Sequence, residues 1–255
     1  MTDLYGQAEL YCAAFSWPVA DEIDWLLSLV PGATSVLEPF CGNARYGSGF
    51  AERGLEYHGL DLSPAMLQRA KLRPGMTLHQ ADARDFTIRD IEFDLAWCPI
   101  NSVRHLLSEE ELVGHLRSVG RHLSSRGVYV VETSLDRRDG PVAEKPSSKA
   151  RWTQTQPDGS AVTCTWWAVR YDLAARRVWE RAHIQRHIGN ELVQEISHVY
   201  EQRMLTDVDW RKLVADGGFT VSRTFVHKRD ECPAVTATAE FENTGRNMYF
   251  FLEPA

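Results

Sequence analysis

The sequence predicts an α/β fold built on a mostly parallel sheet, with an antiparallel β meander inserted after the fifth strand. Short apolar runs, each bounded by turn residues, recur along the first hundred residues, at 33–37, 55–60, 76–81 and 91–97. Such runs are typical of strands buried on both faces. After residue 150 the pattern changes to strict alternation of polar and apolar residues, which predicts the antiparallel strands.

The first apolar run begins a strand, turn and helix unit. Residues 33–37 are small or β-branched, Glu38 closes the run, and Gly42 begins a tight turn before a predicted helix at 45–54. This order is typical of the first unit of a nucleotide-binding domain, in which ligands lie beyond the carboxyl ends of the strands.

Three successive strands are each followed by a carboxylate. Asp61 follows the second strand, where a carboxylate can accept hydrogen bonds from both hydroxyls of a ribose. Asp82 follows the third and could accept from an adenine amine. Glu38 would repel the pyrophosphate of a dinucleotide but attract an ammonium group. The charge pattern therefore favours S-adenosylmethionine over NAD.

Four segments resemble the motifs of the class I S-adenosylmethionine-dependent methyltransferases. The segment 38–45 (EPFCGNAR) resembles the first motif, usually Asp-Leu-Gly-Cys-Gly-Thr-Gly-Arg, and 59–67 (GLDLSPAML) is similar to the second. The third and fourth are QADARDF at 80–86 and FDLAWCP at 93–99. Phe40 and Ala44 replace family glycines, and Glu38 replaces the commoner aspartate. The resemblance covers roughly residues 20–134 and 206–252.

The resemblance implies a Rossmann-like sheet of seven strands, with only the last antiparallel, and a cofactor site at its carboxyl edge. It also implies that an aromatic flap near Tyr11 closes over the cofactor. The cofactor-binding residues expected on this basis are Tyr11, Glu38, Phe40, Gly42, Asn43, Arg45, Asp61, Leu62, Met66, Asp82, Ala83, Cys98 and Pro99.

The other elements follow from capping and periodicity. Pro18 suits the first turn of a helix at 18–30, and Ser108 with Glu111 forms a capping box before a helix whose apolar positions run to Leu123. The remaining expectations are a fifth strand at 128–132, a mobile connector at 134–150, meander strands at 151–156, 161–171, 178–188 and 192–202, a helix at 207–216, a sixth strand at 219–226, a loop at 227–246 and a last strand at 247–252.

We therefore expect a Rossmann-like domain formed by residues 1–134 and 203–255. Residues 135–202 are expected to form an inserted antiparallel subdomain that supplies a substrate pocket, a lid or a dimer contact. Alternation in the strand at 178–188 sends His183 and His187 to one face, and Val178, Ala182, Ile184 and Ile188 to the other.

Candidate catalytic residues are His105, beyond the fourth strand, and Glu132, at the end of the fifth. A general base is needed only when the acceptor must lose a proton first. His105 could instead be a helix-start residue bonded to backbone, and Glu132 could be structural. The expected substrate-binding residues are Phe15, Asn101, Arg104, Trp152, Trp166 and His183. His183 and His187 could also be a solvated pair, and without a third ligand no metal is expected.

Composition limits the partners. A formal net charge of −7 argues against broad nucleic-acid binding, and no apolar run is long enough for a membrane span. The five cysteines lie far apart, and the N-terminus lacks the basic and apolar pattern of a signal peptide. We expect a cytoplasmic protein, without nucleic-acid or membrane partners, that could form a homodimer.

The predicted function is methyl transfer from S-adenosylmethionine to a nitrogen or oxygen of a small metabolite, with S-adenosylhomocysteine as product. The insertion, together with Asn-Ser-Val at 101–103 and His-Leu at 105–106, resembles the sugar-amine N-methyltransferase group. Two alternatives stay open. One is methylation of a protein or RNA, and the other is a non-catalytic protein that binds S-adenosylmethionine or NAD.

Overall fold

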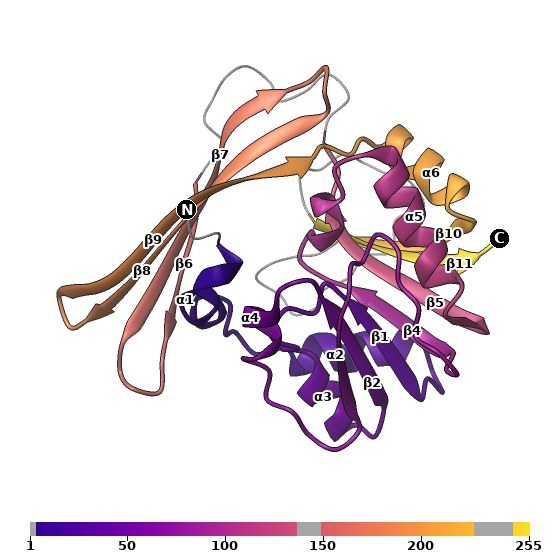
Figure 1. Cartoon of the computed structure of the whole chain (residues 1–255), viewed down its shortest axis with the longest axis horizontal. Coiled ribbons are helices and arrows are strands. Elements are labelled where there is room, and N and C mark those ends of the chain that lie inside the picture. Colours follow the sequence, from indigo (N-terminus) through magenta and orange to yellow (C-terminus); the bar gives the residue numbers. More distant parts are fainter. Residues whose placement is uncertain (1–3, 137–148, 227–246) are drawn as a thin grey trace.

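The computed structural model describes residues 4–136, 149–226 and 247–255. The predicted loop at 227–246 and most of the predicted connector at 134–150 therefore lie outside the described residues. The described chain forms two separate sheets, and a short N-terminal helix packs against the smaller one (Figure 1).

The larger sheet confirms the predicted fold class. Its seven strands have the order β10-β11-β5-β4-β1-β2-β3. Strands β1 to β5 pair in parallel, whereas β11 pairs antiparallel with both β5 and β10. The strands are β1 (Ser35–Pro39), β2 (Glu56–Asp61), β3 (Met76–Gln80), β4 (Phe93–Cys98), β5 (Leu123–Ser134), β10 (Phe219–Val226) and β11 (Asn247–Pro254).

Helices cover both faces of this sheet. One core lies under α5 (Glu109–Gly120) and α6 (Asp207–Asp216), and includes their fully buried Leu116 and Trp210. The other lies under α2 (Ala20–Leu29) and α3 (Gly47–Glu52), and includes Phe50. The short α4 (Pro64–Leu67) follows β2, and the 3₁₀ turn η2 (Ser102–His105) follows β4.

Helix boundaries follow the predicted caps with two corrections. Ser108 and Glu111 form the predicted capping box, but the helix ends at Gly120 and Leu123 becomes the first residue of β5. Residues 123–127 are thus strand rather than helix and turn, and β5 is longer than predicted. Pro18 lies two residues before α2 begins at Ala20, outside its first turn.

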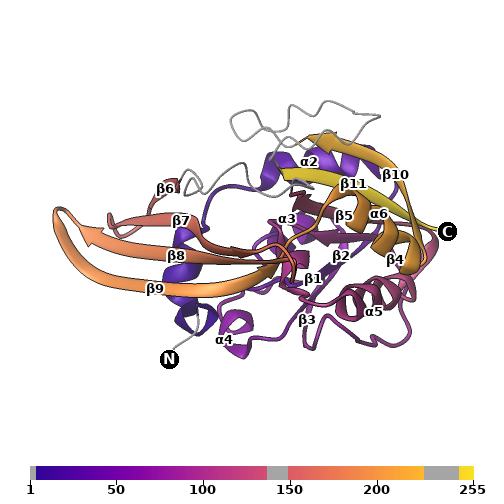
Figure 2. The same cartoon turned by 90° about the horizontal axis from the view of Figure 1, so that it is seen from above.

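The smaller sheet is the predicted meander. Its strands pair in the order β6-β7-β8-β9, all antiparallel, and Gly189, with a φ of +57°, occupies the tight turn before β9. This sheet extends away from the larger one (Figure 2). The strands are β6 (Ala150–Thr155), β7 (Ala161–Asp172), β8 (Arg177–Ile188) and β9 (Glu191–Arg203).

One face of the meander packs on the N-terminal segment η1 (Tyr5–Gln7) and α1 (Ala8–Ala14). The buried residues of this third core are Leu4, Leu10, Ala13, Ala14, Val162, Cys164, Ala182 and Ile184. Ile188, predicted on the same face, is the last residue of β8 and is 59% exposed. The division into a domain of 1–134 and 203–255 and a subdomain of 135–202 stays a prediction. None of the described helices has the length and apolar character of a membrane span.

Candidate active site

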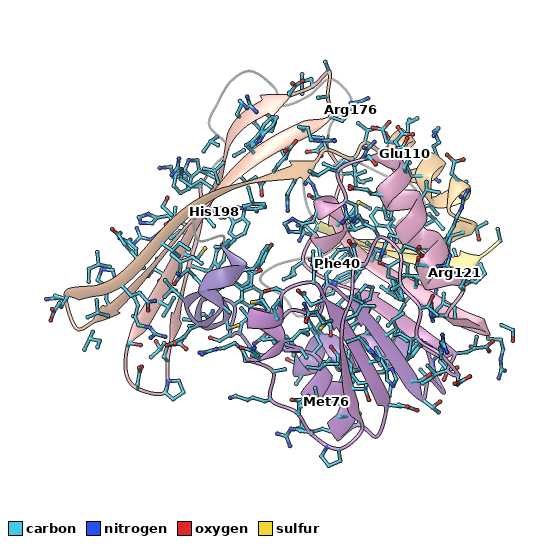
Figure 3. All side chains as sticks on the ribbon, in the orientation of Figure 1. Phe40, Met76, Glu110, Arg121, Arg176 and His198 are labelled. Carbon is cyan, nitrogen blue, oxygen red and sulfur yellow. The ribbon has the colours of Figure 1, made fainter. Side chains whose placement is uncertain are left out.

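A single large cleft runs from the carboxyl edge of the seven-stranded sheet to the meander. Its volume is about 1870 Å³. One part, the strand-edge half, is lined by Glu38, Asp61 and Asp82 with the turns around them. The other, the aromatic half, is lined by rings from η1, α1, η2 and the meander. Figure 3 shows Phe40 on the edge of the larger sheet next to this region, and His198 on the meander.

Glu38 is held inside the strand-edge half. It lies within β1, is only 2% exposed, and accepts a hydrogen bond from the Tyr57 hydroxyl at 2.6 Å. Burial raises the pKa of Glu38 to about 8, although the Tyr57 hydrogen bond acts in the opposite direction. A cationic ligand would relieve this cost, because an opposite charge favours the ionised carboxylate.

Asp61 connects the turn that follows β1 to the turn that follows β2. One carboxylate oxygen accepts from the Gly42 N–H and the other from the Ser63 N–H, each at 2.8 Å. Burial raises the pKa of Asp61, and these two N–H groups lower it. A side chain at Gly42 would meet the Met66 methyl group at 2.9 Å, so the glycine permits this close approach. Each Asp61 oxygen keeps a second lone pair for a ligand hydroxyl.

The two departures from the glycine pattern occupy left-handed backbone. Phe40 has a φ of +60° and Ala44 a φ of +50°, beside Gly42 at +57°. Such values are uncommon for residues other than glycine. The turn therefore keeps a geometry that suits glycine. The Phe40 ring lines the cleft and contacts the His115 ring at a centroid distance of 5.3 Å.

The third carboxylate is already paired. Asp82 accepts from the Arg84 guanidinium through both oxygens, and this pair lowers its pKa. The carbonyl of Ala83 is hydrogen-bonded to His115 Nδ1 at 2.7 Å. Asp82 and Ala83 line the cleft, together with Leu62 and Met66.

Arg45 links the first turn to the N-terminal segment. Its guanidinium donates to the Phe15 carbonyl at 2.8 Å and lies over the Trp17 ring, 4.3 Å from the centroid. Tyr11 stacks on Phe15 with centroids 4.4 Å apart. The predicted flap residues and the neighbouring Asn43 therefore line one wall of the cleft.

The loop after β4 is strained and tightly held. Ile100 and Asn101 have φ values of +50° and +61°. Glu132 Oε2 accepts from the Ile100 N–H at 2.7 Å, and Glu132 Oε1 from Asn247 Nδ2 at 2.7 Å. Asn101 Nδ2 donates to Asn247 Oδ1, and Asn101 Oδ1 accepts from the Ser134 N–H at 2.6 Å. Glu132 thus positions this loop, in a chain of hydrogen bonds that ends on backbone N–H groups.

Two of the predicted residues do not reach the cleft. The Cys98 side chain is fully buried in the core of the sheet, and the cleft begins at the next residue, Pro99. His183 lies on the opposite face of the meander, where Nε2 contacts Glu195 at 3.2 Å. Strand alternation placed His183 away from Ala182 and Ile184, and that apolar pair faces α1.

Arg104 lines the cleft, but its guanidinium is used internally. It donates to the Arg203 carbonyl, to the Ser134 hydroxyl and to Asp136, at 2.9, 2.7 and 3.1 Å. The side chain is 7% exposed. These hydrogen bonds connect β9 to the region after β5, and the substrate contact of Arg104 stays a prediction.

The aromatic half contains a closed circuit of six rings, which we call the ring circuit. Neighbouring centroids lie between 4.4 and 5.9 Å apart. In order around the circuit, the members are Tyr5, Tyr11, Phe15, Trp166, Tyr200 and His105. Trp152 lies beside it and donates to the Ala14 carbonyl at 2.7 Å.

His105 is bonded to Tyr5 rather than to backbone. The Tyr5 hydroxyl and His105 Nε2 lie 2.8 Å apart. Burial lowers the pKa of His105 to about 4, and the charge of Glu180 offsets only part of this effect. The imidazole is therefore neutral at neutral pH.

Sequence reasoning missed two acidic groups. Glu22 accepts from the hydroxyls of Tyr46 and Tyr249, at 2.7 and 2.8 Å, and its pKa is raised by burial and by Glu132. Glu180 accepts from Trp166 and Tyr200. A signal existed for Glu180, because alternation places it with Val178 and Ala182 on the apolar face of β8. No sequence signal marked Glu22, because an acidic residue in the first turn of a helix is common.

Among the described residues no group of three or more side chains could hold a metal ion. The described cysteines 12, 41, 98 and 164 are free thiols, and Cys232 lies outside the described residues.

Solved structures with the same architecture identify the class of fold. An amino pentose methyltransferase from Micromonospora echinaspora, solved with S-adenosylmethionine bound, superposes with a TM-score of 0.73 at 22% identity, covering 96% of each chain. DesVI of Streptomyces venezuelae superposes with a TM-score of 0.70 at 24% identity, covering 99% of this chain and 94% of that one. The chain has the class I methyltransferase fold.

Residues 36–127 match the methyltransferase domain family. A curated relative from Streptomyces venezuelae, dTDP-3-amino-3,4,6-trideoxy-alpha-D-glucopyranose N,N-dimethyltransferase, is 36% identical over 50% of this chain and 52% of its own length. A second, dTDP-3-amino-3,6-dideoxy-alpha-D-glucopyranose N,N-dimethyltransferase of Streptomyces fradiae, is 35% identical over 40% of each chain. The chain thus matches about half, or less, of the length of these relatives.

Proposed function

We propose that this protein transfers a methyl group from S-adenosylmethionine to an amine nitrogen of a small molecule. The observation that supports this most directly is the single cleft that joins the strand-edge half to the aromatic half. Its volume of about 1870 Å³ exceeds the roughly 300–1,000 Å³ of an ordinary small-molecule pocket. The cleft can therefore hold a cofactor and an acceptor together.

The strand-edge half suits the cofactor. Asp61 offers carboxylate lone pairs for a ribose diol, and buried Glu38 favours a ligand with an ammonium group. On the same wall, the Arg45 guanidinium provides a positive charge that can pair with a carboxylate group of the ligand. When bound, S-adenosylmethionine supplies an electrophilic methyl group on a sulfonium. The protein's own part is to hold the acceptor in line with that group and to exclude water.

The state of His105 favours an amine over a hydroxyl acceptor. A hydroxyl must lose its proton to become a strong nucleophile, and a base with a pKa of about 4 removes it poorly. A neutral amine already has a free lone pair, so positioning is sufficient. The relatives whose names describe N,N-dimethyl transfer to amino sugars support the same choice, and they suggest a nucleotide-linked amino sugar as substrate.

A protein or RNA acceptor is less well supported, because rings from the N-terminal segment, η2 and the meander cover the aromatic half. We further propose a cytoplasmic protein that needs no metal, nucleic acid or membrane. The free thiols and the net charge of −7 support this. A homodimer through the meander would cover Ile188, Leu192 and Val193, which are exposed at its end.

The first experiment is calorimetric titration with S-adenosylmethionine, S-adenosylhomocysteine and NAD in parallel. We expect binding of the first two and none of NAD. Mass spectrometry would then follow methylation of amino sugars, with and without a thymidine diphosphate group. Binding of NAD alone, or methylation of hydroxyl compounds in preference to amines, would contradict the proposal.

A further inference from the structure

Glu180 occupies an unusual place in the meander. It projects from β8 on the face that also bears buried Val178 and Ala182, and it lines the cleft. Its Oε2 accepts from Trp166 Nε1 at 2.8 Å and from the Tyr200 hydroxyl at 2.9 Å. Both donors are adjacent members of the ring circuit. A carboxylate is therefore fixed at the edge of an aromatic surface.

The charge of Glu180 is not matched by the described part of the protein. No described Lys or Arg forms an ion pair with it, and Oε1 accepts no hydrogen bond from the described residues. By contrast, other charged side chains in this region have partners of opposite charge. Arg104 is paired with Asp136, and Glu201 on the adjacent strand is paired with Arg177 at 2.9 Å.

Glu180 is half-buried, so water reaches its carboxylate only in part. A cation placed beside it would gain both an ion pair and the faces of the rings. The ring circuit supplies those faces, since Tyr5, Tyr11, Phe15, Trp166 and Tyr200 all line the cleft. His105, the sixth member, is neutral and does not compete with a cation.

We propose that Glu180 and the ring circuit form a subsite for the positive charge that an acceptor nitrogen gains on methylation, and that Glu180 determines the preference for amine acceptors. The identity of the acceptor in this inference rests on the proposed function, whereas the existence of a subsite for positive charge does not depend on it. Methylation of a neutral amine forms an N–C bond, breaks the S–C bond of the donor and moves the positive charge from sulfur to nitrogen. Glu180 stabilises that new charge until the product leaves the cleft, where the nitrogen releases its proton to solvent.

The test measures binding of a simple cation rather than turnover. Choline and its neutral isostere 3,3-dimethylbutan-1-ol are titrated by calorimetry into the whole protein and into Glu180→Gln. We expect wild-type protein to bind choline but not the isostere. Glu180→Gln should bind choline about tenfold or more weakly, because the amide keeps the shape but loses the charge.

Glu201→Gln is the matched control, since it removes an acid from the neighbouring strand outside the cleft, and it should leave choline binding unchanged. Glu180→Asp keeps the charge and should retain part of the affinity, which separates loss of charge from misfolding. Equal binding of choline and the isostere, or equal choline binding by wild type and Glu180→Gln, would overturn the inference. Because no cofactor is present, this result is independent of the titrations that test the proposed function.

Discussion

The two halves of the cleft are built in different ways. In the strand-edge half, the contacts join consecutive strand and turn units of the chain. Gly42 contacts Asp61 and Tyr57 contacts Glu38, each pair 19 residues apart. In the aromatic half, Tyr5 meets His105 across 100 residues and Trp152 meets the Ala14 carbonyl across 138. The strand-edge half therefore follows from the pairing of parallel strands and from the turns at their carboxyl ends. The aromatic half exists only because an N-terminal helix and an inserted sheet pack together.

Asp61→Ala should have the largest effect on the strand-edge half. It removes the proposed ribose contact and also releases the Gly42 and Ser63 N–H groups. We expect a loss of about 1.5–3 kcal/mol in the free energy of S-adenosylmethionine binding, measured by calorimetry. Asp82→Ala should cost less, because Asp82 is already paired with Arg84. Equal affinities of wild type and Asp61→Ala would refute the site assignment.

Glu132→Gln tests the junction of the two halves. An amide cannot accept from both the Ile100 N–H and Asn247 Nδ2 through different atoms, so one donor would face an NH₂ group. We expect the free energy of unfolding to fall by about 1–3 kcal/mol in urea titrations. The same change at half-buried Glu201, which is paired with Arg177, should cost no more than about 1 kcal/mol. A Glu132 variant as stable as the Glu201 variant would show that the strained loop does not depend on this carboxylate.

The pH dependence of cofactor binding tests Glu38. Its pKa in the free protein is raised to about 8, and a bound ammonium group lowers it. Binding therefore releases a proton below pH 8, and affinity should rise with pH between 6 and 8, by at most about tenfold per unit. In the free protein the sign for stability is opposite. The raised pKa stabilises the fold below about pH 4.5, and this contribution is lost as the pH rises through about 8.

Calorimetry at pH 6, 7 and 8 would measure the slope, with Glu38→Gln as the control. The variant should bind with little dependence on pH in this range. An identical slope in wild type and Glu38→Gln would assign the proton to another group, of which Glu22 is the nearest alternative because burial raises its pKa as well.

The smallest effect is expected in the first turn. Ala44→Gly should stabilise the protein by about 0.5 kcal/mol, since relief of left-handed strain exceeds the entropy that glycine loses on folding. Gly42→Ala should destabilise it by about 1–2 kcal/mol, because the new methyl group also meets Met66. Thermal unfolding of both variants checks the difference. A stabilising Gly42→Ala would mean that this turn differs from the structure described.

By itself the sequence determined the order and type of the secondary elements and most of the strand-edge half. Apolar runs, capping boxes and strict alternation are local signals, and parallel strands bring their carboxyl ends to one edge whatever follows. Asp61 and the glycine turn could therefore be predicted, as could the meander that follows β5.

Only the tertiary structure decided what the other side chains touch. Packing directs His183 to the outer face of the meander, and it engages the Arg104 guanidinium in internal hydrogen bonds. Glu22 and Glu180 were unremarkable acids until tyrosines and a tryptophan from remote segments met them. The physical reason is the same in each case. A side chain's chemistry depends on burial and on neighbours brought together by long-range contacts, and periodicity along the chain does not specify these.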